Sequence, residues 1–293
     1  MKDDKIVISS RALPPIRRLR LLAAAAVVLL GVFCLTACGS RDAAPIDAER
    51  ETIAKAEEVE KNTFKQSEET ENDTMKTAEE REEMLEVGSV RLSVKEAGSG
   101  TDMILIHGRT LSKEDMDPLF DRYKERYHVV SYDVRGHGKT ESGGTCTLDD
   151  LSDDLVGLID AYQLEKPVVI GFSMGSYIAL RTAERYPDLF SGIVLIGTRG
   201  KGHVSRFSIS DEVADAMKNF DNMTDISKAV APALVLTGEN DFINPPEEGE
   251  NVAKALPDAE FMLVPDAEHE AYKTNPDFVF EQTDIFLERL SLS

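Results

Sequence analysis

The chain has 293 residues, of which 42% are hydrophobic, so it is long enough to bury a sizeable globular core. Its formal net charge of −21 disfavours general electrostatic binding to nucleic acid or to an anionic lipid surface, and no nucleic-acid partner is expected. The three cysteines form no CxxC pair or Cys/His cluster, so no metal site is expected, and no motif calls for a cofactor.

Residues 1–37 have the pattern of a targeting segment. A basic stretch, PPIRRLR, precedes twenty residues without charge, LLAAAAVVLLGVFCLTACGS. The tetrapeptide LTAC at residues 35–38 resembles the lipobox of bacterial lipoproteins, which implies cleavage before Cys38 and lipidation of that cysteine. Because the basic flank stays inside, we expect a lipid-anchored protein on the extracytoplasmic face of the cell membrane. An uncleaved membrane span is the alternative.

Residues 38–86 are expected to form an acidic stalk. Between residues 41 and 87 there are sixteen acids against seven bases, and large apolar side chains are rare. Such a stretch buries too little apolar surface to offset the entropy lost on ordering, so we expect it to be partly helical or disordered. A coiled-coil partner site is the alternative, although no heptad pattern persists.

From residue 87 to residue 293, apolar segments alternate with amphipathic ones. Strands are predicted at 90–98, 103–108, 128–133, 167–171, 192–197, 233–238 and 260–264, and helices at 113–127, 147–164, 174–186 and 278–290. Nearly continuous apolar strands that alternate with helices predict an α/β domain with a mostly parallel, doubly wound sheet. Residues 198–232 are predicted to form a short helical lid that includes SDEVADAMKNF.

Ser173 lies in GFSMGS, where a buried strand turns at once into a helix. Such a turn has room only for small residues two positions before and after, and Gly171 and Gly175 occupy these positions. The helix N-terminus directs free N–H groups toward the serine, which favours an oxyanion there. This context indicates a nucleophilic serine.

A serine hydroxyl needs a base and an orienting carboxylate to become nucleophilic. Of the five histidines, His269 follows the last predicted strand, and Asp241 follows the strand before it. His203 also follows Ser173, but no carboxylate stands between them at a strand end. The predicted order is therefore Ser173, Asp241, His269.

Five segments carry a family resemblance: HGR, DVRGHGKTE, GFSMGS, TGENDFINPP and AEHEAY. In this order they resemble the α/β-hydrolase fold family, in its single-domain, esterase-like branch. The resemblance implies that Ser173 is the nucleophile, His269 the general base and acid, and Asp241 its orienting carboxylate. It also implies an oxyanion hole made by the backbone N–H groups of Arg109 and Met174. The chain departs from the family pattern at Glu268 and Ser176, where glycine is usual.

RGHGKT, within the second of these segments, is not a phosphate-binding Walker loop, because Asp133 stands where that motif needs its first glycine. The expected activity is hydrolysis of a small-molecule carboxylic ester, thioester or lactone. The alternatives are C–C cleavage, perhydrolysis, amide or peptide hydrolysis, or a catalytically silent binding domain. Arg199 and Lys201, in TRGKGHVSR, are candidate contacts for an anionic substrate group; the alternative is that these cations balance the negative field of the lid.

Overall fold

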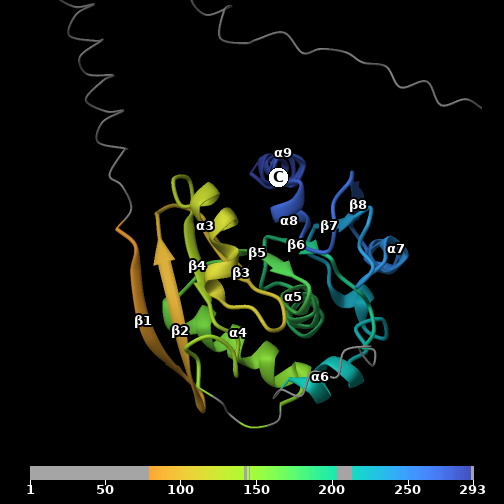
Figure 1. Cartoon of the computed structure of the whole chain (residues 1–293). Coiled ribbons are helices and arrows are strands. Elements are labelled where there is room, and N and C mark those ends of the chain that lie inside the picture. Colours follow the sequence, from red (N-terminus) through yellow and green to blue (C-terminus); the bar gives the residue numbers. More distant parts are fainter. Residues whose placement is uncertain (1–78, 142–143, 145, 203–212, 292–293) are drawn as a thin grey trace, which may run out of the picture. The chain divides into compact units, whose positions relative to one another are not determined.

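Within the residues that the computed structural model describes (79–141, 144, 146–202 and 213–291), eight strands form one sheet in the order β1-β2-β4-β3-β5-β6-β7-β8 (Figure 1). β1, β2 and β4 pair antiparallel, and all pairings from β4 through β3 to β8 are parallel. The predicted α/β class with a mostly parallel sheet is confirmed. Contacts divide the chain into residues 1–75 and 76–293, and every described residue lies in the second unit.

The strands are β1 (Arg81–Val87), β2 (Val90–Ala97), β3 (Asp102–Ile106), β4 (His128–Tyr132), β5 (Val168–Phe172), β6 (Gly192–Ile196), β7 (Ala233–Gly238) and β8 (Ala259–Val264). The α-helices are α3 (Asp117–Tyr123), α4 (Leu148–Tyr162), α5 (Met174–Arg185), α6 (Ala214–Asn219), α7 (Pro246–Ala255), α8 (Ala271–Thr274) and α9 (Pro276–Leu290). Two 3₁₀ turns are η1 (Lys113–Met116) and η2 (Ile226–Lys228).

The sheet separates two hydrophobic cores. In β3, Ile104 and Ile106 belong to one core and Met103 and Leu105 to the other, because successive strand residues point to opposite faces. Helices α4, α5 and α7 supply side chains to the first core, and α3, α8 and α9 supply them to the second. Covering both faces in this way leaves the carboxyl ends of the parallel strands as the place where loops of different strands meet.

The domain begins earlier than expected. β1 pairs with β2 from Arg81↔Glu96 to Val87↔Val90, so the boundary predicted at residue 87 is wrong by a whole strand. The sequence pattern predicts stalk here because most side chains of β1 are polar; in the structure they are exposed, as edge-strand side chains often are. The signal that could have found it is the two-residue Gly88–Ser89 connection, with Gly88 at φ 55°.

The helix predicted over 113–127 is divided into η1 and α3. Pro118 lies in the first turn of α3, where it fits, and it has no N–H with which to continue the preceding turn. In the lid, α6 and η2 are described, and Lys201 pairs with Asp221 in an isolated bridge. Cys38, the targeting segment, the stalk up to residue 78 and lid residues 203–212 lie outside the described residues. In the ranges that are described, no helix is both long and apolar enough to cross a bilayer.

Candidate active site

Ser173 stands between β5 and α5 with φ 49° and ψ −113°, a conformation that non-glycine residues rarely adopt. A Cβ atom at Gly171 would collide with the carbonyl of Gly175, and one at Gly175 would collide with the carbonyl of Ile106. The turn therefore requires both glycines, as the sequence pattern indicated, and it presents the Ser173 hydroxyl at the carboxyl end of the sheet.

His269 lies between β8 and α8 and connects Ser173 to Asp241. Its Nε2 is 3.0 Å from Ser173 Oγ, and its Nδ1 is 2.7 Å from Asp241 Oδ2. Since a carboxylate is an acceptor only, Nδ1 carries the proton and donates it, which leaves Nε2 to accept from the serine hydroxyl. The structure thus brings together the three side chains predicted from chain order.

The carboxylate of Asp241 is fully buried, and both of its oxygens are hydrogen-bonded. Its Oδ1 accepts hydrogen bonds from the backbone N–H groups of Ile243 (2.9 Å) and Asn244 (2.8 Å), while Oδ2 faces His269. These bonds orient the carboxylate and offset part of the cost of burying its charge. The position of Asp241 after β7 therefore provides both the reach to His269 and the local N–H donors.

The imidazole of His269 is held by packing as well as by hydrogen bonds. The ring of Phe172, which precedes the serine, lies 4.9 Å from the His269 ring, centroid to centroid. Glu268, the departure from the family pattern, has an exposed side chain, and its N–H donates to Thr274 Oγ1 at 3.2 Å. A side chain at this position is therefore compatible with the contacts that His269 makes to Ser173 and Asp241.

The two candidate oxyanion-hole residues lie close to the turn that carries Ser173. Met174 is the first residue of α5, and Arg109 follows the His107–Gly108 turn after β3. Gly175 packs so closely on the carbonyls of Ile106 and His107 that the two segments lie side by side. Arg109 and Met174 therefore belong to adjoining backbone segments beside Ser173.

His107 has a structural position. It is completely buried, donates from Nδ1 to the Gly108 carbonyl (2.7 Å) and accepts at Nε2 from the N–H of Val134 (2.9 Å). Burial lowers its pKa to about 4, so the imidazole is neutral near neutral pH and its two nitrogens keep these opposite roles. His107 thereby ties the loop that carries Arg109 to the loop after β4.

Arg199 and Lys201 each pair with a carboxylate of the protein. The guanidinium of Arg199 lies 2.9 Å from Glu248 Oε1, and its side chain is only 11% exposed. Lys201 is 64% exposed and lies 3.0 Å from Asp221 Oδ2. Both charges are balanced by carboxylates of the protein itself, which favours the charge-balancing alternative over contact with an anionic substrate group. His203 and Arg206 lie outside the described residues.

Sequence reasoning missed two buried residues beside the site, Tyr177 and Asn244. The Asn244 Nδ2 donates to the Tyr177 hydroxyl at 2.6 Å. The sequence signal for Asn244 was weak, because FINPP reads as the turn before a surface helix, and Tyr177 fits the apolar pattern of α5.

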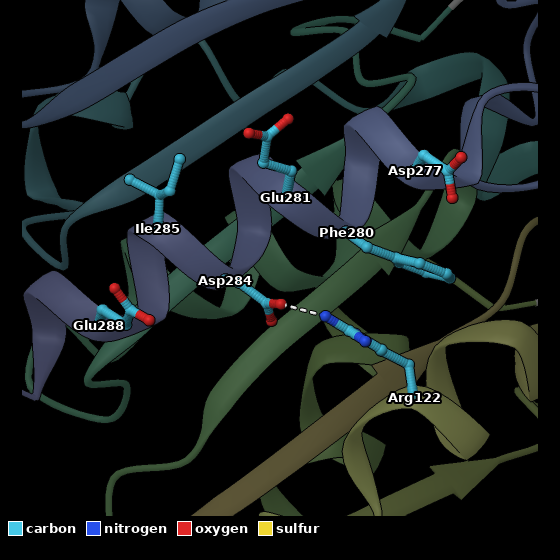
Figure 2. A pocket seen from close by; sticks show the side chains of 7 residues that line it. All are labelled: Arg122, Asp277, Phe280, Glu281, Asp284, Ile285 and Glu288. Carbon is cyan, nitrogen blue, oxygen red and sulfur yellow. Dashed lines mark hydrogen bonds and ion pairs between the residues drawn. The ribbon is translucent and has the colours of Figure 1, made fainter. Parts of the chain in front are cut away.

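A separate groove of about 360 Å³ lies along α9, and Figure 2 shows its lining side chains: Arg122, Asp277, Phe280, Glu281, Asp284, Ile285 and Glu288. Arg122 forms an ion pair with Asp284. The three residues of the candidate site do not line this groove. Among the described residues, no group of three or more His, Cys, Asp or Glu side chains is arranged to hold a metal ion.

Two family models match this chain. Residues 103–225 match the family model described as alpha/beta hydrolase fold, and residues 214–292 match the model described as TAP-like protein. A 2-(acetamidomethylene)succinate hydrolase of Mesorhizobium japonicum is 33% identical over 113 residues, which are 38% of this chain and 41% of that protein. The match thus covers less than half of that relative.

Two further similarities extend over most of the domain. The proline iminopeptidase PfmaB of Pestalotiopsis fici is 24% identical over 279 residues, covering 71% of this chain and 99% of that protein. The solved structure of a thermophilic esterase from Thermogutta terrifontis, with malate bound, has a TM-score of 0.65 at 22% identity and covers 72% of this chain and 99% of that one. Two family models that together span residues 103–292, and the matching architecture of the solved structure, show that this chain has the α/β-hydrolase fold.

Proposed function

We propose that this protein is a serine hydrolase that cleaves a carboxylic ester, thioester or lactone through an acyl-enzyme on Ser173. The observation that carries the proposal is the hydrogen-bonded chain from Ser173 through His269 to Asp241, with distances of 3.0 and 2.7 Å, on a strained strand-to-helix turn. These are the nucleophile, base and orienting acid that acyl transfer requires.

In the proposed first half-reaction, His269 Nε2 takes the proton from Ser173 as Oγ attacks the carbonyl carbon of the substrate. The resulting oxyanion accepts hydrogen bonds from the backbone N–H groups of Met174 and Arg109, each worth about 3 kcal/mol of transition-state stabilisation. The tetrahedral intermediate then expels the leaving group, which receives the proton from His269. Asp241 remains ionised throughout and stabilises the imidazolium.

In the proposed second half-reaction, water replaces the leaving group. His269 takes a proton from the water, whose oxygen attacks the acyl carbon, and a second tetrahedral intermediate forms in the same oxyanion hole. Its collapse breaks the bond between the acyl carbon and Ser173 Oγ, which regains its proton from His269. The acid product is released and the side chains return to their initial state.

Hydrolysis of an amide is the second candidate. The relatives described above include proteins named as a 2-(acetamidomethylene)succinate hydrolase and a proline iminopeptidase, and the same triad chemistry serves both ester and amide bonds. A catalytically silent binding domain is less favoured, because the strained backbone at Ser173 costs stability and a binding role gives no reason to keep it.

A fluorophosphonate probe separates an enzyme from a silent domain. The wild-type protein should be labelled, and Ser173→Ala should not be. Labelling that survives Ser173→Ala, or no labelling of the wild type, would refute the proposal. A panel of p-nitrophenyl esters, thioesters, lactones and anilides of varied chain length would then rank ester against amide substrates by kcat/KM.

We also propose that the protein is anchored to the extracytoplasmic face of the cell membrane through a lipid on Cys38. The support is the uncharged run that ends in LTAC at residues 35–38, behind a basic flank. Cys38→Ser should leave the precursor uncleaved, with a mass that retains the signal segment and lacks the lipid. Normal processing of that variant would refute the anchor.

A further inference from the structure

Asn244 is fully buried and bonds to segments that carry or border all three residues of the candidate site. Its backbone N–H donates to Asp241 Oδ1 at 2.8 Å. Its side-chain Nδ2 donates to the Tyr177 hydroxyl (2.6 Å) and to the Gly197 carbonyl (2.5 Å). Both hydrogens of the amide are therefore used, and an apolar residue of the same size could replace neither.

Tyr177 extends this contact to the nucleophile. It lies four residues after Ser173, one turn along α5, so its side chain stands on the same face of the helix. Burial raises the pKa of Tyr177, so the hydroxyl stays protonated, and the backbone N–H of Tyr177 donates to the Ser173 carbonyl at 3.3 Å.

The third residue, His269, is reached through Gly197. A Cβ atom added at Gly197 would lie 3.1 Å from His269 Cε1. The backbone at Gly197 therefore packs directly against the imidazole, at the carbon between its two nitrogens. The Asn244 amide holds this backbone by its carbonyl. The Asn244 side chain thus links Gly197, after β6, to Tyr177 on α5. Its backbone N–H links both to Asp241, in the loop after β7.

The Tyr177 ring is itself fixed from the lid side. Phe220, just after α6, stacks on it with a centroid distance of 4.8 Å and an interplanar angle of 25°. Asn222 Nδ2 donates to the Tyr177 carbonyl at 3.0 Å. These contacts hold both the ring and the backbone of Tyr177 in place.

We propose that the Asn244–Tyr177 hydrogen bond is a positioning device that keeps Ser173, His269 and Asp241 aligned for acyl transfer. The inference rests on the proposed hydrolase function and adds two residues to it. The three side chains come from three separate loops, and an error of about 1 Å in their alignment costs on the order of 100-fold in rate. A direct bond between the nucleophile helix and the acid loop limits that error.

Tyr177→Phe is the deciding variant, because it removes one oxygen atom and keeps the stacked ring. We expect kcat to fall about tenfold with KM changed less than about twofold, since alignment acts on the transition state and not on substrate binding. The pseudo-first-order rate of fluorophosphonate labelling at Ser173 should fall by a similar factor. Asn244→Ala, which also frees the Gly197 carbonyl, should lower kcat by about 30-fold or more.

The matched control is Tyr162→Phe, which also deletes a tyrosine hydroxyl that makes one hydrogen bond, here to Glu83 Oε1 at 2.7 Å. It should leave kcat unchanged. The double variant Tyr177→Phe/Asn244→Ala should be no slower than Asn244→Ala alone, because both single changes break the same bond. A purely structural role would lower the thermal midpoint without this non-additivity in kcat.

All measurements use the full-length protein. If the wild type is labelled at Ser173 but Tyr177→Phe is labelled and turns over as fast as the wild type, the positioning role is refuted while the hydrolase proposal stands. Additive losses in the double variant would refute the shared bond in the same way. If the wild type itself is not labelled, the hydrolase proposal fails, and this inference falls with it.

Discussion

His269 Nδ1 lies 2.7 Å from Oδ2 of the fully buried Asp241, whose other oxygen already accepts from Ile243 and Asn244. The two backbone donors decide how an amide would sit at this position. In Asp241→Asn, the side-chain oxygen would face the two N–H groups, and the NH₂ group would face His269. The imidazole would then have to accept at Nδ1 and carry its proton on Nε2, where Ser173 needs an acceptor.

Asp241→Asn should therefore lower kcat by about 10³- to 10⁴-fold through the wrong tautomer, with the far-ultraviolet circular dichroism spectrum unchanged. Asp258→Asn, a change at an exposed carboxylate, is the matched control and should retain full turnover. His203→Ala should also keep most of its activity. A loss below tenfold in Asp241→Asn, or an equal loss in His203→Ala, would contradict the assignment of the acid and the base.

His128 is held between two carboxylates, with Nδ1 2.8 Å from Asp102 Oδ1 and Nε2 3.1 Å from Glu96 Oε2. Burial lowers the pKa of His128, but hydrogen bonds to the two carboxylates outweigh it, and the net pKa is raised. Because the folded state binds this proton more tightly than the unfolded state, the stabilisation is complete below the unfolded pKa of about 6.5 and is lost as the pH rises through the folded pKa.

The pH dependence is tested with His128→Gln. The free energy of unfolding of the wild type should exceed that of the variant by about 1 kcal/mol more at about pH 5.5 than at about pH 9, since the imidazole is partly exposed and its ion pairs are partly screened. Urea unfolding at both pH values measures the difference. The same difference at both pH values would show that protonation of His128 adds nothing to stability.

β1 should contribute to the stability of the domain. It pairs with β2 through seven residue pairs, Arg81 forms an ion pair with Glu96 at 2.9 Å, and Val87 packs against Gly157 of α4. A chain that begins at residue 88 should therefore have a thermal midpoint about 5–10 °C below that of a chain that begins at residue 79. Equal midpoints in circular dichroism melts would support the later boundary expected from the sequence.

The two lid cations should differ in their effect on stability. The mostly buried guanidinium of Arg199 donates to Glu248 and to Asn244 Oδ1, and Arg199→Ala removes both bonds. This change should lower the free energy of unfolding by about 1–3 kcal/mol. Lys201→Ala removes an exposed ion pair to Asp221 and should change it by less than about 0.5 kcal/mol. Urea denaturation measures both. The reverse order would contradict the described pairing.

Local patterns in the chain were enough to predict the sheet class and the three residues of the candidate site. Apolar runs that end in Gly-x-Ser, in Asp241 and near His269 each mark a strand end, and parallel strands bring such ends to one edge. β1 could not be recognised in this way, because its exposed edge carries almost no apolar alternation. The break between η1 and α3 did have a local signal, Pro118 in the first turn of α3, which marks the start of a helix better than its middle.

The sequence by itself determined which residue types stand at the strand ends, because backbone strain, glycine spacing and hydrophobic period are properties of neighbouring residues. Only the tertiary structure decided which distant side chains meet. Asn244 and Tyr177 are 67 positions apart, and Arg199 and Glu248 are 49 apart. Whether a buried amide finds a hydroxyl, or a cation finds a carboxylate before a substrate does, depends on packing across several elements, and no periodic pattern along the chain encodes that contact.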